Sequence, residues 1–264
     1  MGMKSLGNES SPFGHSSVRR GMAGATRFTI PPDPFQGLAA VFPSGIRAGS
    51  TLTLSGALGS GVSRFCYELL AWWSISWGFC VLVDLTRKAS PAAIVAAGVD
   101  LARLVVLRPA AHRTDRIASA IGALIDGFPL TVVLAPPGAI QDWVIRKARA
   151  RAASRGVVVC FATPGERREP TLAPLSIILS CEEWFSDSLG ILSQRRIKAS
   201  VREYGSSRVA FITERAGCPH LYVASQRSEG LLSISASENA SFQERFIWRP
   251  DDPKGYLEVA VNGS

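Results

Sequence analysis

Histidine is scarce in this chain of 264 residues, and its few histidines do not lie in catalytic or metal-binding patterns. The three are His15, His112 and His220, and no G-x-S-x-G turn accompanies them. Cys218 and His220 are the nearest approach to a metal-ligand pair, whereas a zinc site requires three or four ligands. We therefore expect no hydrolase or proton-transfer site, no bound metal and no cofactor.

Ordered cysteine spacing and long apolar runs are also missing. The five cysteines are odd in number and widely spaced, which is typical of reduced thiols rather than a disulfide framework. The best candidate for a membrane span, residues 69–83, is interrupted by serine and glycine and is shorter than the roughly 20 apolar residues that a span needs. No apolar run of signal-peptide length follows Arg19 and Arg20. These absences predict a cytoplasmic protein without a membrane partner.

Charged residues make up only 19% of the chain and apolar residues 47%, a balance that predicts a folded protein. Residues 1–33 are rich in glycine, serine and proline and are predicted to be a disordered leader. Residues 44–212 are predicted to form the folded core, and residues 213–264 a mostly flexible tail. The tail has isolated large apolar residues that suit docking against a protein partner, although a tail without a role is the alternative. The docking candidates are Phe242, Phe246, Ile247 and Trp248.

Apolar runs alternate with helical patterns through the predicted core, as in βαβ units. The expected strands are 50–55, 79–85, 104–107, 130–135 and 157–162, and the expected helices are 63–76, 91–98, 113–126 and 140–154. Beyond Pro174 a run at 175–180 and the alternation of Ile197, Ala199 and Val201 with polar residues predict half-exposed antiparallel strands at a sheet edge. The predicted fold class is α/β, a mostly parallel sheet flanked by helices with antiparallel edge additions.

The turn after the first of these strands has the spacing of a phosphate-binding loop but lacks its lysine. Residues 56–63 fit G-x-x-x-x-G-K-[ST] except that valine stands where lysine belongs. The lysine supplies positive charge to the phosphates, which an aliphatic side chain cannot do. The strand 130–135 also ends at Ala135, without a carboxylate for magnesium. The residues of this degenerate loop are Gly56, Gly59, Ser60, Gly61, Val62 and Ser63.

The stretch 50–109 resembles the RecA family. After the loop and its helix come a strand that ends in Asp84, then the sequence AAGVDL at 96–101 and RLVVLRP at 103–109, in the order and separation found in that family. The resemblance extends over about residues 44–212 and implies a RecA-like fold of the P-loop NTPase type. It places the catalytic glutamate at Thr86, so Val62, Thr86 and Ala135 together predict a protein that does not hydrolyse ATP.

Among RecA-like proteins, the chain is similar to the ImuA-type accessory proteins of the bacterial mutasome, in particular the actinobacterial variety. This resemblance implies a scaffold for damage-induced translesion synthesis, with an inactive Y-family polymerase of the ImuB type and an error-prone replicative-type polymerase as partners. RecA itself is a further candidate partner, and the protein would associate with the nucleoid after DNA damage. Two alternatives stay open: a divergent ATP-binding RecA paralogue in DNA repair, and a cell-division inhibitor of the SulA type.

Basic residues are concentrated in two windows, 146–168 and 195–215, within a chain whose formal charge is +8. They predict a surface for the DNA backbone or an acidic partner, and a merely solvated surface is the alternative. Trp72, Trp73 and Trp77 follow the loop at helical spacing and are expected in the core, with an exposed docking ring as the alternative. The candidate basic residues are Lys147, Arg151, Arg155, Arg196, Lys198 and Arg202.

Overall fold

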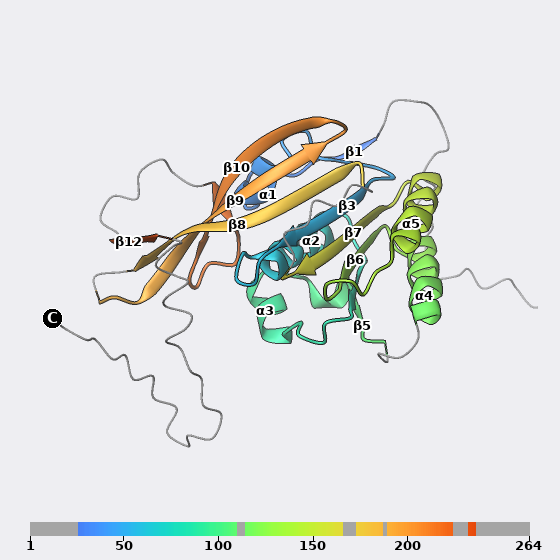
Figure 1. Cartoon of the computed structure of the whole chain (residues 1–264), viewed down its shortest axis with the longest axis horizontal. Helices are drawn as coiled ribbons and strands as arrows, with labels where there is room; N and C mark the ends of the chain where they lie inside the picture. Colours follow the sequence, from blue (N-terminus) through green and yellow to red (C-terminus); the bar gives the residue numbers. More distant parts are fainter. Residues whose placement is uncertain (1–25, 110–113, 166–172, 187–188, 224–231, 236–264) are drawn as a thin grey trace, which may run out of the picture.

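The computed structural model describes residues 26–109, 114–165, 173–186, 189–223 and 232–235, which are built around one large sheet (Figure 1). Nine strands follow one another across it in the order β11-β10-β9-β8-β3-β7-β6-β4-β5. The six strands from β8 to β5 are parallel, and β9, β10 and β11 continue the sheet antiparallel. The predicted α/β class, with a mostly parallel sheet between helices, is confirmed.

The parallel part of the sheet follows the predicted alternation closely. Ser90 caps α3 by accepting a hydrogen bond from the Ala93 amide, and Pro91 fits the first helical position, where no N–H is required. Gly156, with a positive φ of 70°, ends α5. In chain order the elements are β3 (Thr51–Gly56), α2 (Val62–Ser76), β4 (Cys80–Asp84), α3 (Pro91–Ala96), η1 (Leu101–Arg103), β5 (Leu104–Leu107), α4 (Thr114–Gly127), β6 (Leu130–Leu134), α5 (Asp142–Arg155) and β7 (Val158–Pro164).

The strands after β7 differ from the prediction in direction and length. β8 (Leu175–Ser186) was expected to be antiparallel but lies parallel to β3, and it continues well beyond the predicted residue 180. The antiparallel part begins with β9 (Leu192–Glu203) and continues with β10 (Ser206–Arg215) and β11 (Tyr222–Val223). The alternation along β9 is as predicted, because Ile197, Ala199 and Val201 are buried between more exposed polar residues. β12 (Leu232–Ser235) pairs with the distal end of β8.

The folded region is wider than residues 44–212 on both sides. β1 (Arg27–Phe28), α1 (Gln36–Val41) and β2 (Ile46–Arg47) precede β3, and the Phe28 ring lies 4.7 Å from that of Trp73. The predicted boundary at 212 falls inside β10, and Leu221 beyond it is buried against α1. Neither end has a periodic apolar pattern, because its few apolar residues pack individually against distant elements.

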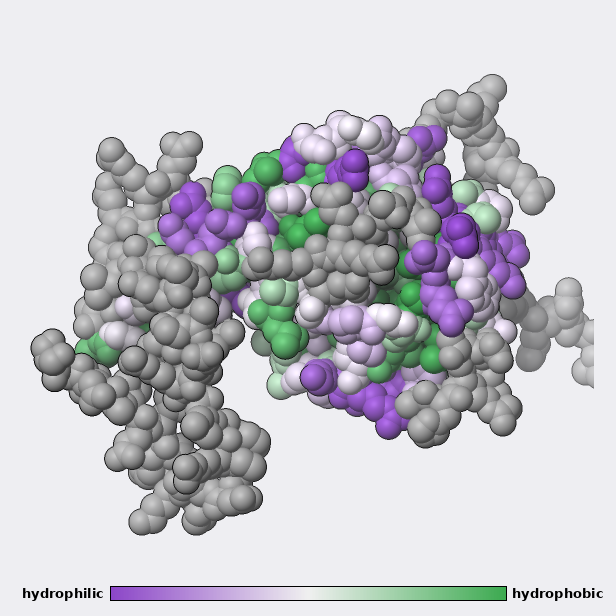
Figure 2. Space-filling view, in the orientation of Figure 1, coloured by the Kyte–Doolittle hydropathy of each residue, from purple (hydrophilic) through white to green (hydrophobic). Residues whose placement is uncertain are grey.

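Two hydrophobic cores lie on the two sides of the sheet. The larger one joins α1, α2 and α3 to the sheet and contains Trp72 and Trp73, whose side chains are fully buried as predicted. Trp77 instead keeps 45% of its surface exposed. The smaller core joins α4 and α5 to the sheet. Figure 2 shows hydrophilic residues over α4 and α5 and again over β9 and β10, with hydrophobic residues exposed between them.

Candidate functional site

The degenerate phosphate loop occupies the turn from β3 into α2. Gly59 and Gly61 have positive φ values of 79° and 94°, so the turn requires glycine at both positions. Its last glycine precedes the first residue of α2, and no side chain caps that helix. The Ser60 amide donates to the carbonyl of Ala57 at 3.0 Å, which closes the turn on itself. The loop therefore keeps the strand–turn–helix form of a phosphate-binding loop.

The residue in the lysine position belongs to the hydrophobic core. Val62 is only 3% exposed and packs in the larger of the two cores. An aliphatic side chain here adds buried apolar surface to the start of α2, which stabilises the fold by about 1.5–3 kcal/mol relative to exposure. Val62 therefore contributes packing energy at this position and no charge.

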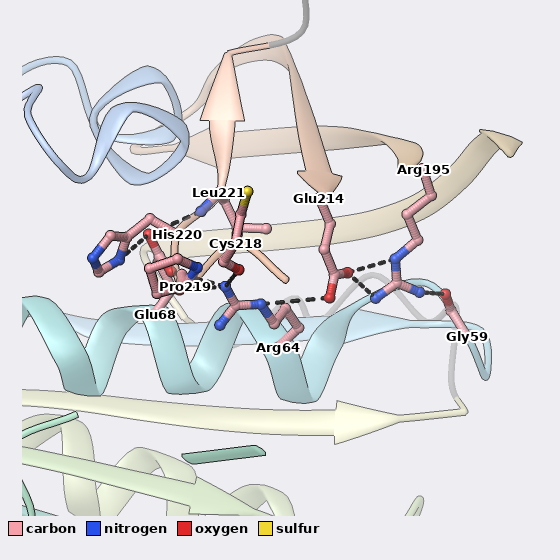
Figure 3. Close-up of polar contacts among 9 residues, drawn as sticks. All are labelled: Gly59, Arg64, Glu68, Arg195, Glu214, Cys218, Pro219, His220 and Leu221. Atoms are coloured by element: carbon pink, nitrogen blue, oxygen red, sulfur yellow. Dashed lines mark hydrogen bonds and ion pairs between the residues drawn. The ribbon is translucent and has the colours of Figure 1, made fainter. Parts of the chain in front are cut away.

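An arginine from the antiparallel part of the sheet lies against the outside of the loop (Figure 3). The Arg195 guanidinium donates to the carbonyl of Gly59, and its Nε donates to Glu214 Oε2 at 2.6 Å. The guanidinium carbon Cζ of Arg195 lies 5.3 Å from the centre of the Trp184 ring. Because this arginine is 14% exposed and paired with a carboxylate, its charge is compensated at the loop. It connects β9 and β10 with the turn.

Arg64 continues this network along α2. Its Nε lies 3.5 Å from Glu214 Oε1 and its Nη2 lies 3.6 Å from Glu68 Oε2, one helical turn further on. The same guanidinium donates to the carbonyls of Cys218 and Pro219. Arg64 is the residue after the loop's hydroxyl position, and it points toward β10 and the segment before β11 (Figure 3).

At the far end of the network, Glu68 is fully buried in α2. Its Oε1 accepts a hydrogen bond from the Leu221 amide at 3.1 Å and lies 3.4 Å from His220 Nδ1. Burial raises the pKa of the Glu68 carboxyl to about 7, against the opposing effects of the Leu221 amide and Arg64. Burial also lowers the pKa of His220, and Arg64 adds to that effect. Both directions favour an uncharged Glu68–His220 pair at mildly acidic pH, so this contact is not an ion pair there, and the hydrogen bond that holds Glu68 comes from the Leu221 amide.

The residues at the end of β4, where the resemblance to the RecA family places a catalytic glutamate, form an internal hydrogen-bond network. Asp84 has no exposed surface, and its Oδ1 accepts a hydrogen bond from the Thr86 hydroxyl at 2.7 Å. Its Oδ2 accepts from the Ala89 amide and from Arg108 Nε, each at 3.1 Å. Thr86, which stands where the resemblance places a catalytic glutamate, therefore serves to hold the neighbouring aspartate. Asp84 therefore accepts three hydrogen bonds on its two oxygens and stabilises the turn that follows β4.

The strand end at Ala135 also offers no ligand. Ala135 is 2% exposed and its amide donates to the carbonyl of Ala162 at 2.9 Å. Within the described parts of the chain, no three His, Cys, Asp or Glu side chains come together to hold a metal ion. Among those same residues, no helix is long and apolar enough to cross a membrane.

The structure separates the six predicted basic residues into two groups. Arg151 and Arg155 of α5 both bind Asp126 of α4, through Arg151 Nε at 2.8 Å and Arg155 Nε at 3.1 Å. Lys147 lies beside a cavity of about 260 Å³ between these two helices. The other three residues, Arg196, Lys198 and Arg202, lie on β9. The docking candidates Phe242, Phe246, Ile247 and Trp248 lie outside the described residues.

Sequence reasoning missed the residues that surround the loop from the antiparallel strands. Arg195, Glu214 and His220 are separated from the loop by more than 130 positions, and His220 was placed in the flexible tail. One local signal was present, because Glu68 is an acid within the otherwise apolar run of α2. A buried carboxylate needs partners, and these come from Arg64 in the same helix and from His220 and Leu221 in the segment before β11.

One family model matches the chain. It describes the MT3502 N-terminal domain and matches residues 40–166, just under half of the sequence. The matched region runs from α1 to the end of β7 and includes the loop, Asp84 and both predicted helices α4 and α5. No curated protein matches the chain.

Proposed function

We propose that this protein is a non-catalytic scaffold of RecA-like fold, in which the former phosphate loop has become a structural junction. The residues packed around the loop support this proposal most directly. Val62 packs in the core, and Arg195 binds the loop carbonyl of Gly59 while its own charge is compensated by Glu214. Catalysis of phosphoryl transfer requires uncompensated positive charge aimed at the phosphates.

The assembly that we propose for this scaffold is the damage-induced translesion synthesis complex. The support is the resemblance of residues 44–212 to ImuA-type accessory proteins, for which the partners are an inactive Y-family polymerase and an error-prone replicative-type polymerase. RecA is the third candidate partner. A divergent ATPase would require a cation at the loop, and Arg195 reaches it, but as a donor to a carbonyl. A SulA-type inhibitor would bind a tubulin-like GTPase in place of the polymerases.

Nucleotide binding and turnover test the first part of this proposal. We expect the full chain to show no calorimetric Mg-ATP binding at micromolar concentrations and no phosphate release above background. We expect Val62→Lys to remain inactive, because Thr86 has no carboxylate to orient water and Asp84 is held by three internal donors. Low-micromolar Mg-ATP affinity of the unaltered protein would contradict the proposal.

Capture experiments with purified candidates test the second part. Immobilised full-length protein should retain the inactive Y-family polymerase and should not retain a tubulin-like division GTPase. Retention of the GTPase alone would replace the translesion assignment by the division-inhibitor alternative. Retention of neither protein would remove the support for both assemblies.

A further inference from the structure

A cavity of about 260 Å³ lies between α4 and α5, the two helices that cover the smaller core (Figure 1). It is lined by small residues on both helices, among them Ala118 and Gly122 on α4 and Ala148 on α5. A Cβ atom added to Gly122 would meet the Arg151 guanidinium at 3.1 Å and no other side chain within 4 Å. The two helices therefore leave a hollow, the α4–α5 groove, that their own side chains do not fill.

The two ends of the α4–α5 groove differ in chemistry. At the start of α5, Trp143 keeps 41% of its surface exposed, and its Nε1 donates to the Gln141 side chain. Two helical turns further on, Arg151 Nε donates to Asp126 at 2.8 Å, and Arg155 Nε donates to the same carboxylate at 3.1 Å. Because two guanidinium groups share one carboxylate, this second end keeps an excess of one positive charge.

Lys147 borders the groove between these ends, one turn from Trp143 and one turn from Arg151. In the described structure, its ammonium and the guanidinium of the preceding Arg146 take part in no hydrogen bond or ion pair. Helix α5 contains five basic residues and one acid, Asp142, so its surface is positive, and Figure 2 shows hydrophilic residues over α4 and α5. The groove therefore combines an apolar hollow, an exposed ring and an unpaired ammonium.

This combination suits a protein segment better than a nucleic acid or a small molecule. The apolar walls at Ala118, Val144 and Ala148 accept an apolar side chain, whereas a nucleobase would bury polar edges that need partners. Tight binding to a nucleic-acid backbone also requires several phosphate contacts, and the groove has Lys147 alone as an unpaired cation on its lining. The cavity is smaller than the roughly 300–1,000 Å³ of small-molecule sites and has room for one large side chain.

We infer that the α4–α5 groove binds an acidic protein segment, which inserts one large apolar side chain beside Trp143 and places a carboxylate at Lys147. Complementary charge selects an acidic segment, and an anchoring side chain in a pocket with a polar rim carries most of the binding energy in many interfaces. Arg151 and Arg155 close one end of the groove, because Asp126 already occupies them. The inference rests on the proposed scaffold function and names the chemistry of a partner segment for it.

Fluorescence anisotropy with a labelled peptide tests the inference on the full chain. The probe is a peptide of about 12 residues with one central tryptophan between runs of aspartate and glutamate. We expect it to bind with a Kd below about 100 μM, and we expect replacement of its tryptophan by alanine to weaken binding at least about tenfold.

A charge reversal tests the role of Lys147. We expect Lys147→Glu to weaken binding of the tryptophan peptide about tenfold, because a carboxylate of the peptide then meets a like charge. The matched control is Lys88→Glu, which makes the same charge change in the exposed turn after β4, away from the groove. We expect this control to change the affinity by less than about twofold.

A variant that fills the cavity tests the place of the anchoring side chain. Ser119 is an exposed residue of α4 that lines the groove, so its replacement should leave the melting temperature within a few degrees of the parent. We expect Ser119→Phe to weaken binding of the tryptophan peptide at least about tenfold, because the new ring occupies the hollow. Ser119→Ala leaves the hollow open and should bind like the parent.

Four results would overturn the inference. They are no binding of the peptide up to about 100 μM, equal affinity for the tryptophan and alanine peptides, equal effects of the Lys147 and Lys88 variants, and unchanged affinity in a folded Ser119→Phe. Displacement of the peptide by oligo-dT at lower concentration than by unlabelled peptide would also overturn it, in favour of a nucleic-acid site. Capture of the inactive polymerase that persists without peptide binding rejects this inference alone, whereas peptide binding without any capture rejects the proposed assembly alone.

Discussion

At the scale of single residues, the most unusual group in the described structure is the buried carboxyl of Glu68. It lies in an apolar helix, has no exposed surface, and contacts a histidine that burial also keeps uncharged. Ionising either group inside the protein costs free energy that ionisation in the unfolded chain does not. The junction between α2 and the segment before β11 is therefore sensitive to pH.

The raised pKa of Glu68, about 7 against an ordinary value of 4.5, predicts how stability depends on pH. Between these values the folded protein holds a proton that the unfolded chain has lost, so this group's contribution falls as pH rises from about 4.5 to about 7. Glutamine does not ionise in this range. We therefore expect the free energy of unfolding of Glu68→Gln to fall by on the order of 1–3 kcal/mol less than that of the parent as pH rises. Urea unfolding of both proteins at pH 5.5 and pH 8 measures this difference in the free energy of unfolding. Equal pH dependence in the variant and the parent would contradict the assignment.

A second prediction at this scale concerns the arginine that braces the loop. Removing Arg195 leaves Glu214 partly buried with Arg64 as its one ion-pair partner among the described residues, and the Gly59 carbonyl loses the Arg195 donor. We expect Arg195→Ala to destabilise the fold by about 2 kcal/mol. In a double-mutant cycle with Glu214→Ala, a coupling free energy of about 1 kcal/mol or more is expected. A coupling near zero would show that the pair is a surface contact without energetic weight, and Arg208→Ala provides a control arginine on β10.

At the scale of secondary-structure elements, the segment from the middle of β10 to β11 decides where the domain ends. Thr213 is 3% exposed in β10, and Leu221 is 1% exposed with its carbonyl bound to the Gly37 amide at 2.9 Å. A side chain at Gly37 would collide with Leu221, so α1 and this segment are in close contact. These residues belong to the core although the sequence around them is polar.

Two truncations test this boundary. A chain that ends after residue 212 leaves Glu68 and Arg64 with only each other among their described partners, so we expect its melting temperature to fall by more than 10 °C or the protein to fail to fold. A chain that ends after residue 235 keeps every described element and is expected to melt within a few degrees of the full chain. If the predicted docking residues 242–248 act as proposed, this second chain loses capture of the polymerase partner. Full capture would move docking to the folded domain.

At the scale of the whole molecule, the sheet has two parts that are covered differently. The parallel part has helices on both sides, whereas in the described residues the antiparallel part has helices only on the side of the larger core. Strands with two covered sides bury their backbone amides most completely. Among the described residues, this difference leaves one side of the antiparallel part without a helix packed against it.

Hydrogen exchange followed by mass spectrometry tests this division. We expect amides of β3, β4, β6 and β7 to exchange slowest, because all four strands are fully or almost fully buried. The edge strands β5 and β11 are expected to exchange at least tenfold faster, since each has a strand on one side only in the described sheet. Equal protection of the central and the edge strands would contradict this expectation.

The sequence alone determined the alternation of strands and helices in the parallel part of the fold and the absence of a lysine from the loop. Continuous apolar runs, glycine positions and Ser90-Pro91 are local signals, because backbone geometry and burial on both sides restrict residue types within a few positions. The absence of the loop lysine and of carboxylates at Thr86 and Ala135 is likewise readable directly. The strand 175–180 was also visible, but its direction was not, since an apolar run carries no information about which neighbour it pairs with.

Only the tertiary structure decided which residues surround the degenerate loop and which charged residues pair. Arg195 reaches the loop, and Glu214 and His220 reach α2, from more than 130 positions away, and nothing in their local sequence indicates these contacts. The same holds for the basic residues, because their sequence does not reveal that Asp126 pairs with Arg151 and Arg155 of α5 and that Glu183 pairs with Arg196 of β9. Local patterns specify backbone conformation and burial, whereas pairing of charges depends on distances between segments that only the folded chain brings together.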